Sequence, residues 1–140
     1  MSTFFFNFST MYKLIIFSAV IVCAMSAGGK TQVDVDSEDA KGAALEAMRH
    51  INQRSNTLQY QHLRQIHSAH RQVVAGIKWY LDISFVTTQC RKTEVDLTNL
   101  VEVTEETCPA QEGATEERCQ IELWLKPWEN FSQVVSQQCN

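Results

Sequence analysis

Hydrophobic and polar residues alternate along much of the second half of the chain, which is the pattern of β-strands with one buried face. The clearest run covers residues 77–85, and a second run with the same period covers residues 119–125. Residues 58–71 are more polar and alternate less strictly, and residues 131–135 form a short apolar stretch near the end. We therefore predict four extended segments in this part of the chain.

A helix is predicted ahead of these strands, from residue 37 to about residue 52. Its apolar side chains recur at helical spacing. They are Ala40, Ala44, Ala47, Met48 and Ile51. Asp36 or Ser37 can cap the helix, and the acidic Glu38 and Asp39 suit its first turn. Because the stripe includes several alanines, the helix can lie close against a sheet.

Residues 86–118 form a long acidic connection between two of the predicted strands. Val95, Leu97, Val101 and Val103 share parity within it, so part of the connection is expected to be extended. Its many glutamates are most simply a solvated surface. Because one helix is followed by antiparallel strands, without strand–helix–strand alternation, the pattern predicts an α+β fold.

The first 27 residues have the layout of a secretory signal peptide. Lys13 precedes an apolar run that ends in small residues. The run is too short for a transmembrane helix, which needs about 20 apolar residues. We predict cleavage between residues 24 and 27, with Met11 as an alternative start and an uncleaved anchor as the competing interpretation. A single domain then covers residues 28–140.

The five cysteines favour a secreted, disulfide-bonded domain. Cys23 lies in the segment that would be removed, which leaves an even set in the C-terminal half. This set is Cys90, Cys108, Cys119 and Cys139. Four cysteines allow three pairings into two disulfides, and the residues alone leave the pairing open. A zinc site is the alternative use, but no Cys-x-x-Cys pair occurs.

Charge and the remaining chemistry argue against several function classes. The chain carries 12 basic and 16 acidic side chains, a net charge of −4, and loss of Lys13 with the signal makes it −5. Such a charge disfavours nucleic acid and anionic membrane surfaces as partners. On a regular strand, His62 and His70 share a face and His67 points away, so we expect no metal site. No Ser-His-Asp or Cys-His arrangement is assignable once the cysteines are bridged, so neither an enzyme nor a cofactor is expected.

The first predicted turn carries apolar side chains where polar ones are usual. It covers residues 72–76, between two extended segments, and Gly76 supplies the backbone freedom of a tight hairpin. Val73, Val74 and Ala75 nevertheless are apolar. An apolar exposed turn either folds back onto its own domain or is covered by a partner.

The second predicted turn, residues 126–129, has the same character. Pro127 cannot continue a central strand ladder, so Trp128 falls within the turn. A tryptophan there is either buried in the core or held out as a binding anchor. In a meander both turns can lie at one edge of the sheet, and Gly28 and Gly29 provide a bendable N-terminal segment.

The two turns and the N-terminal glycines together resemble the cystatins, secreted inhibitors of papain-like cysteine proteases. Residues of the first turn match the family's Gln-x-Val-x-Gly hairpin: Gln72, Val73, Val74, Ala75 and Gly76. Pro127 and Trp128 match the second hairpin, and Gly28 and Gly29 match the N-terminal glycine at the family's spacing. The four cysteines match the disulfide-bearing type 2 branch. The resemblance covers nearly the whole mature chain.

This resemblance implies a single long helix packed on a curved antiparallel sheet, with sequential disulfides Cys90–Cys108 and Cys119–Cys139. It also implies reversible inhibition without catalysis, in which the N-terminal glycines and both hairpins form a wedge over the protease's catalytic groups. The implied partners are papain-like proteases of the cathepsin L, B or S type, and we expect a secreted monomer. The alternative is a secreted binding or signalling module of the same fold that inhibits no protease.

Three local features modify this expectation. Ser55 and Asn56 resemble the Ser-Asn-Asp with which some cystatins inhibit legumain, although Thr57 replaces the aspartate; the alternative is a helix-terminating asparagine. Asn130 opens an Asn-x-Ser glycosylation sequon beside the second hairpin, where a glycan would hinder docking. Residues 100–107 look inserted relative to vertebrate cystatins, which affects the local loop.

Overall fold

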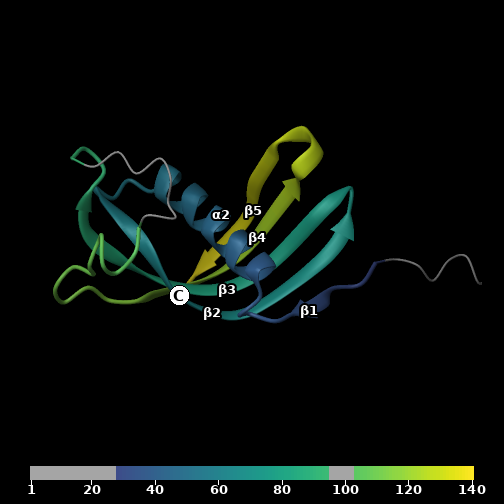
Figure 1. The fold of residues 1–140 in the computed structure, drawn as a ribbon, viewed down its shortest axis with the longest axis horizontal. Coiled ribbons are helices and arrows are strands. Elements are labelled where there is room, and N and C mark those ends of the chain that lie inside the picture. Colours follow the sequence, from purple (N-terminus) through teal and green to yellow (C-terminus); the bar gives the residue numbers. More distant parts are fainter. Residues whose placement is uncertain (1–27, 95–102) are drawn as a thin grey trace, which may run out of the picture.

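The computed structural model describes residues 28–94 and 103–140, and in it one helix lies across one face of a five-stranded antiparallel sheet (Figure 1). Neighbouring strands in the sheet follow the order of the chain. The elements are β1 (Thr31–Val33), α2 (Glu38–Arg54), β2 (Gln59–Val74), β3 (Gly76–Arg91), β4 (Glu117–Lys126), the short 3-10 helix η3 (Pro127–Glu129) and β5 (Phe131–Cys139). The predicted α+β fold, with one long helix on an antiparallel sheet, is confirmed.

Helix α2 is held by a side-chain cap at its start and by a buried amide near its end. The hydroxyl of Ser37 accepts a hydrogen bond from the Ala40 N–H (3.3 Å), so Ser37 is the N-cap of the two candidates. The side chain of Asn52 is buried and exchanges two hydrogen bonds with the backbone of Gln61 (2.7 and 2.9 Å). The helix continues to Arg54, slightly beyond its predicted end.

The core lies between the helix and one face of the sheet. The helix residues predicted to form the apolar stripe are all buried. They form one cluster with buried side chains of β3 and β4, namely Trp79, Leu81, Ile83, Phe85, Ile121 and Leu123. The apolar positions of the two predicted alternating runs therefore face the core.

Strand β3 is longer than the alternating pattern predicted. The acidic connection was expected to begin at Val86, but the strand continues to Arg91. Val86 and Thr88 are both buried, and the Thr88 hydroxyl donates a hydrogen bond to the Tyr60 carbonyl of β2 (2.8 Å). Val86 and Thr88 lie on the sheet face opposite Phe85, so the buried face of the strand changes at this point and the alternating pattern of residues 77–85 does not continue.

Strand β2 alternates weakly in sequence because three register shifts interrupt its pairing with β3. They lie between Gln59 and Gln61, between Leu63 and Gln65 and between Ile66 and Ser68, and the last two each place one extra residue on β2. Each extra residue moves the following side chains to the opposite face, so the apolar positions lose their strict period. The extended segment predicted for residues 58–71 is confirmed, with β2 covering nearly all of it.

Both disulfides follow the sequential pairing that the resemblance implied. Cys119 and Cys139 face each other in the register of β4 and β5 and are bonded. Because β5 pairs with β4 up to this point, the last strand extends well beyond its predicted end near residue 135.

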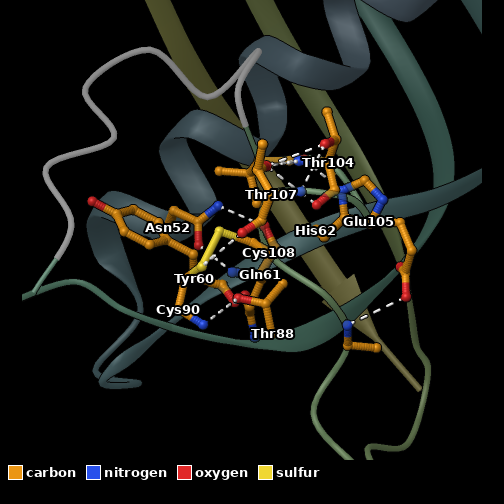
Figure 2. The surroundings of a disulfide bond; sticks show 12 residues. Asn52, Tyr60, Gln61, His62, Thr88, Cys90, Thr104, Glu105, Thr107 and Cys108 are labelled. Atoms are coloured by element: carbon orange, nitrogen blue, oxygen red, sulfur yellow. Dashed lines mark hydrogen bonds between the residues drawn. A yellow bond between two sulfur atoms is a disulfide. The ribbon is translucent and has the colours of Figure 1, made fainter.

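The other disulfide joins Cys90, near the end of β3, to Cys108 in the acidic connection (Figure 2). An isolated bridge between Thr88 and Ala110 attaches the same segment to the sheet. Val103 is buried there, and its carbonyl lies 2.7 Å from a ring nitrogen of His62. This part of the connection is therefore packed on the domain.

Several predictions concern residues outside the described ranges. The signal peptide, its cleavage site, Met11 and Cys23 all fall within residues 1–27. Most positions of the acidic connection that were expected to be extended fall within residues 95–102. Among the described residues, no helix is long and apolar enough to cross a membrane.

Candidate binding edge

Both hairpin turns lie at the same end of the sheet (Figure 1). β2 ends at Val74 and β3 starts at Gly76, while Ile77 pairs with Leu125 close to the second turn. In an antiparallel sheet this register places the two turns side by side. Gly28 and Gly29, which precede β1, reach the same end, because Thr31 pairs with Arg71 and Gly28 lies beside Val73. We call these three segments the tip edge: Gly28–Gly29, Gln72–Gly76 and Pro127–Trp128.

The first turn presents apolar side chains to solvent, as the sequence suggested. Val73 is 71 % exposed and Val74 is 40 % exposed. Gly76 has φ +107°, and a Cβ there would lie 2.3 Å from the Leu125 carbonyl oxygen. Only glycine fits, because the backbone is in the left-handed region and the neighbouring strand approaches closely. The turn is therefore fixed sterically against β4.

The second turn is a compact 3-10 helix that begins with a proline. Pro127 lies in its first turn, and the Asn130 N–H donates to the Pro127 carbonyl (3.3 Å). Asn130 has φ 53°, a conformation that asparagine tolerates better than most residues. Trp128 is 68 % exposed, so it is held out from the core. An ion pair between Lys126 and Glu129 (3.3 Å) spans the turn.

Trp124 connects the two turns, a role that the sequence analysis missed. It lies on β4, and its indole N–H donates to the Ala75 carbonyl of the first turn (3.0 Å). Its ring packs edge-to-face on Phe131 at 5.4 Å between centroids, and the Lys126 ammonium lies 4.6 Å from the ring. Alternation placed Trp124 on the polar face, and a tryptophan at such a position was the available signal.

The N-terminal glycine lies against the first turn. A Cβ at Gly28 would lie 3.1 Å from the Val73 carbonyl oxygen, so a larger residue would press on the turn. The side-chain amide of Gln72 donates a hydrogen bond to the Gly28 carbonyl (2.7 Å). A Cβ at Gly29 would meet nothing within 4 Å, so the steric requirement is specific to Gly28.

A polar cluster on α2 contacts β5 just after the second turn. A ring nitrogen of His50 lies 2.8 Å from the Ser132 hydroxyl of β5. Burial and the neighbouring Arg49 charge hold the pKa of His50 below its ordinary value. The Arg49 guanidinium donates hydrogen bonds to Glu46 and holds the pKa of that carboxyl below its usual range. Folding therefore shifts the equilibrium of His50 toward the neutral imidazole.

Asn56 lies away from the tip edge, in the loop between α2 and the start of β2, and its side chain is exposed. The Lys92 ammonium donates to the carbonyls of Asn52 (2.7 Å) and Ser55 (3.1 Å) and to the Ser55 hydroxyl (3.0 Å). The hydroxyls of Ser55 and Thr57 lie 2.8 Å apart, on either side of Asn56. This loop is therefore tied down around an exposed asparagine.

The histidines do not converge in the structure. His62 contacts the Val103 carbonyl, and His67 lies 3.2 Å from the Ser84 hydroxyl. Within residues 28–94 and 103–140, the one group of potential metal ligands combines Glu117 with the two sulfurs of the second disulfide. Because those sulfurs are bonded to each other, they offer no thiolate to a metal.

Comparison with known proteins gives one consistent family. The cystatin domain model matches residues 28–101. L-cystatin of Tachypleus tridentatus is 34 % identical over 112 residues, which cover 80 % of this chain and 80 % of that protein. Cystatin-1 of Chilobrachys guangxiensis is 30 % identical over 131 residues, which cover 91 % of this chain and 94 % of that protein.

Two solved structures show the same fold. The crystal structure of Al-CPI is 33 % identical with a TM-score of 0.65, covering 81 % of this chain and 98 % of that chain. Dimeric human cystatin F has a TM-score of 0.67 at 21 % identity, covering 81 % of this chain and 86 % of that chain. At that identity the second match concerns the fold alone.

Proposed function

The chain belongs to the cystatin family, and from this membership we propose that it is a secreted, reversible inhibitor that enters the active-site cleft of papain-like cysteine proteases with its tip edge. Members of the family are protease inhibitors, so the chain is a cystatin-type cysteine protease inhibitor and not an enzyme. Proteases of the cathepsin L, B and S type are the proposed targets. A monomer is the proposed inhibitory form.

The observation that carries the proposal is the exposure of large apolar side chains on a rigid edge. Val73, Val74 and Trp128 are among the few large hydrophobic side chains exposed in the described chain. Burying one such side chain in a cleft contributes about 1.5–3 kcal/mol. Because the turns are already fixed by Gly76 and Trp124, docking orders little additional structure and loses little entropy.

The same geometry explains inhibition without cleavage. The tip edge offers two hairpin turns and an N-terminal segment, all held by neighbouring backbone. In the proposed complex these turns cover the catalytic groups of the protease and hold no peptide bond in the position of attack. The inhibitor then dissociates from the protease with its peptide bonds uncleaved.

Titration of the secreted protein against papain and a cathepsin L-type protease tests the proposal. We expect Trp128→Ala and Val74→Asp each to weaken inhibition by at least about tenfold, because each removes burial of an apolar anchor. Val135→Asp is the matched control, because Val135 is exposed on β5 away from the turns. Absence of inhibition by the parent at micromolar concentration would refute the proposal and favour the binding or signalling module.

A glycan on Asn130 is proposed to modulate this docking. Asn130 is exposed and closes the second turn two positions after Trp128. The measurement is the inhibition constant of protein secreted from a glycosylating host before and after enzymatic removal of N-glycans. We expect removal to strengthen inhibition, and an identical constant for a glycosylated sample would contradict this.

A second inhibitory site for legumain-type proteases is proposed at Ser55–Asn56. The supporting observation is the exposed Asn56 in a loop held by Lys92 and by the Ser55–Thr57 contact. Thr57 makes this contact in place of the family's aspartate and also donates to the Gln59 carbonyl (3.1 Å). A loop fixed in this way can present the asparagine as a substrate-like residue.

Two substitutions separate the legumain site from the tip edge. Asn56→Ala should abolish legumain inhibition and leave papain inhibition unchanged, while Val74→Asp should do the reverse. The inhibition constants of both variants against both proteases provide the measurement. If the parent protein fails to inhibit legumain, Asn56 has only a structural role.

A further inference from the structure

We propose that Tyr80 is a positioning residue for inhibition, which acts through Gln72 to hold the N-terminal glycine segment against the first hairpin. The inference rests on the proposed function but concerns a residue outside the tip edge. Tyr80 lies on β3 between Trp79 and Leu81, which are buried in the core. Alternation along the strand therefore places Tyr80 on the sheet face opposite the helix.

Tyr80 is bonded directly to the side chain of Gln72. Gln72 pairs with Lys78 and His70 pairs with Tyr80, so Gln72 and Tyr80 are diagonal neighbours on one face. The Tyr80 hydroxyl donates to the Gln72 side-chain oxygen Oε1 (3.0 Å). The Gln72 nitrogen Nε2 then donates to the Gly28 carbonyl (2.7 Å).

The direction of these bonds is set by the Gly28 carbonyl. A backbone carbonyl only accepts hydrogen bonds, so Gln72 must turn its NH₂ group toward Gly28. Its oxygen then faces β3, where the Tyr80 hydroxyl is the donor. Without that hydroxyl, the Gln72 side-chain amide can rotate, and its NH₂ group is no longer held toward the Gly28 carbonyl. Tyr80 thus fixes the side chain that contacts the N-terminal segment.

A second residue of the N-terminal segment, Lys30, contacts the Tyr80 ring directly. The Lys30 ammonium lies 3.5 Å from the centroid of the Tyr80 ring, within the range of a cation–π interaction. Lys30 directly precedes β1, a strand of three residues that pairs with β2. Because so short a strand supplies few backbone hydrogen bonds, these side-chain contacts add to what holds the segment on the sheet.

The arrangement pre-orders the segment before any protease is present. A free N-terminal segment would have to be ordered during docking, which weakens binding. With Gly28 already against Val73, the segment and the first hairpin present one surface. Tyr80→Phe removes only the hydroxyl and keeps the ring under Lys30, so it isolates the hydrogen bond to Gln72.

The first measurement uses the free protein and needs no protease. Amide hydrogen exchange of residues 31–33 is compared in the parent, in Tyr80→Phe and in Tyr60→Phe. The last variant is the matched control, because it makes the same change at the other end of β2. We expect faster exchange in Tyr80→Phe alone, by about 2- to 10-fold, the range of one ordinary hydrogen bond. Unchanged exchange overturns the proposal.

The second measurement is a double-mutant cycle with the N-terminal segment. Inhibition of papain is measured for the parent and Tyr80→Phe, each in the secreted form and in a form beginning at Thr31. We expect Tyr80→Phe to weaken inhibition about 2- to 10-fold in the secreted form and to have no effect in the shortened form. An equal loss in both forms, or no loss in either, overturns the proposal.

The two measurements separate this inference from the proposed function. If the parent does not inhibit papain, the function is wrong and the exchange measurement still decides whether Tyr80 holds the segment. If the parent inhibits papain and Tyr80→Phe changes neither measurement, the function stands and the role of Tyr80 is refuted. Thermal unfolding of each variant identifies any general loss of folding.

Discussion

The tip edge and the opposite end of the sheet are built in different ways. The opposite end, which we call the loop end, comprises residues 55–58, 88–94 and 103–116. At the tip edge the chain turns tightly and is fixed by close backbone packing at Gly76 and by one indole hydrogen bond from Trp124. At the loop end a longer connection is attached by a disulfide and by side-chain hydrogen bonds, several of which are drawn in Figure 2.

This difference determines which substitutions each end of the sheet tolerates. Contacts such as the Arg64–Glu105 ion pair (2.8 Å) are made by exposed, flexible side chains that can adjust to changes in the loop. The first turn of the tip edge has less freedom, because Gly76 packs closely against the β4 backbone at Leu125. We therefore expect changes at the loop end to affect stability without weakening papain inhibition, and changes at the tip edge to affect papain inhibition as well.

Removal of the Cys90–Cys108 disulfide should give the largest effect on stability. Replacing both cysteines by serine should lower the free energy of unfolding by about 3 kcal/mol, the typical contribution of a disulfide that closes a loop of this size. Papain inhibition, measured well below the melting temperature, should be unchanged. A parallel weakening of inhibition in the folded variant would show that the two ends are coupled.

Gly76→Ala should have the next largest effect and should alter both properties. The new Cβ would lie 2.3 Å from the Leu125 carbonyl oxygen at φ +107°. Strain of this kind costs about 1–3 kcal/mol, and movement of the turn should weaken papain inhibition as well. Chemical denaturation and papain titration provide the measurements.

Gly42→Ala is the matched control for that substitution. Gly42 lies within α2, and a Cβ there would meet nothing within 4 Å. Alanine should stabilise the helix by up to about 1 kcal/mol and leave inhibition unchanged. Similar behaviour of the two variants would contradict the steric explanation for Gly76.

Trp124→Phe should have an intermediate effect, because it keeps an aromatic ring beside Phe131 but removes the N–H donor to Ala75. We expect the free energy of unfolding to fall by about 1 kcal/mol, and the binding free energy for papain to weaken by a similar amount. Trp128→Phe, by contrast, should leave the melting temperature unchanged, because Trp128 is exposed. A Trp124 variant with the parent's stability and affinity would show that the two turns are independent.

The smallest expected effect concerns pH and His50. Its lowered pKa means that the folded protein binds fewer protons at this site than the unfolded chain. The resulting stability is complete above the unfolded pKa of about 6.5 and is lost as pH falls through the folded pKa. His50→Gln cannot titrate and should flatten the fall in melting temperature as the pH drops below about 6.5.

The groups around His50 should leave this comparison interpretable. Glu46 also has a lowered pKa, caused first by its hydrogen bond from Arg49, so its contribution is lost at lower pH, below its ordinary value of 4.5. The pKa of Arg49 is raised, first by its hydrogen bond to Glu46, so its charge does not change in this range, and Ser132 does not titrate there. Parallel melting curves for the parent and His50→Gln would rule out a contribution from the imidazole.

Local periodicity predicted most of the fold. The alternating run at residues 77–85 and the helical stripe from Ala40 to Ile51 each follow from the geometry of a single element. Turn residues such as Gly76 and Pro127 likewise act within a few positions of the chain. The pattern failed where an element depends on its neighbours, as in β3 beyond Phe85 and in β2 with its three register shifts.

The sequence by itself determined that two apolar turns exist and that four cysteines lie in the second half of the chain. Only the tertiary structure decided that the turns lie side by side, that Trp124 joins them and that Tyr80 reaches Gln72. The physical reason is that composition and spacing are properties of one segment, whereas these contacts depend on the register between strands far apart in the chain.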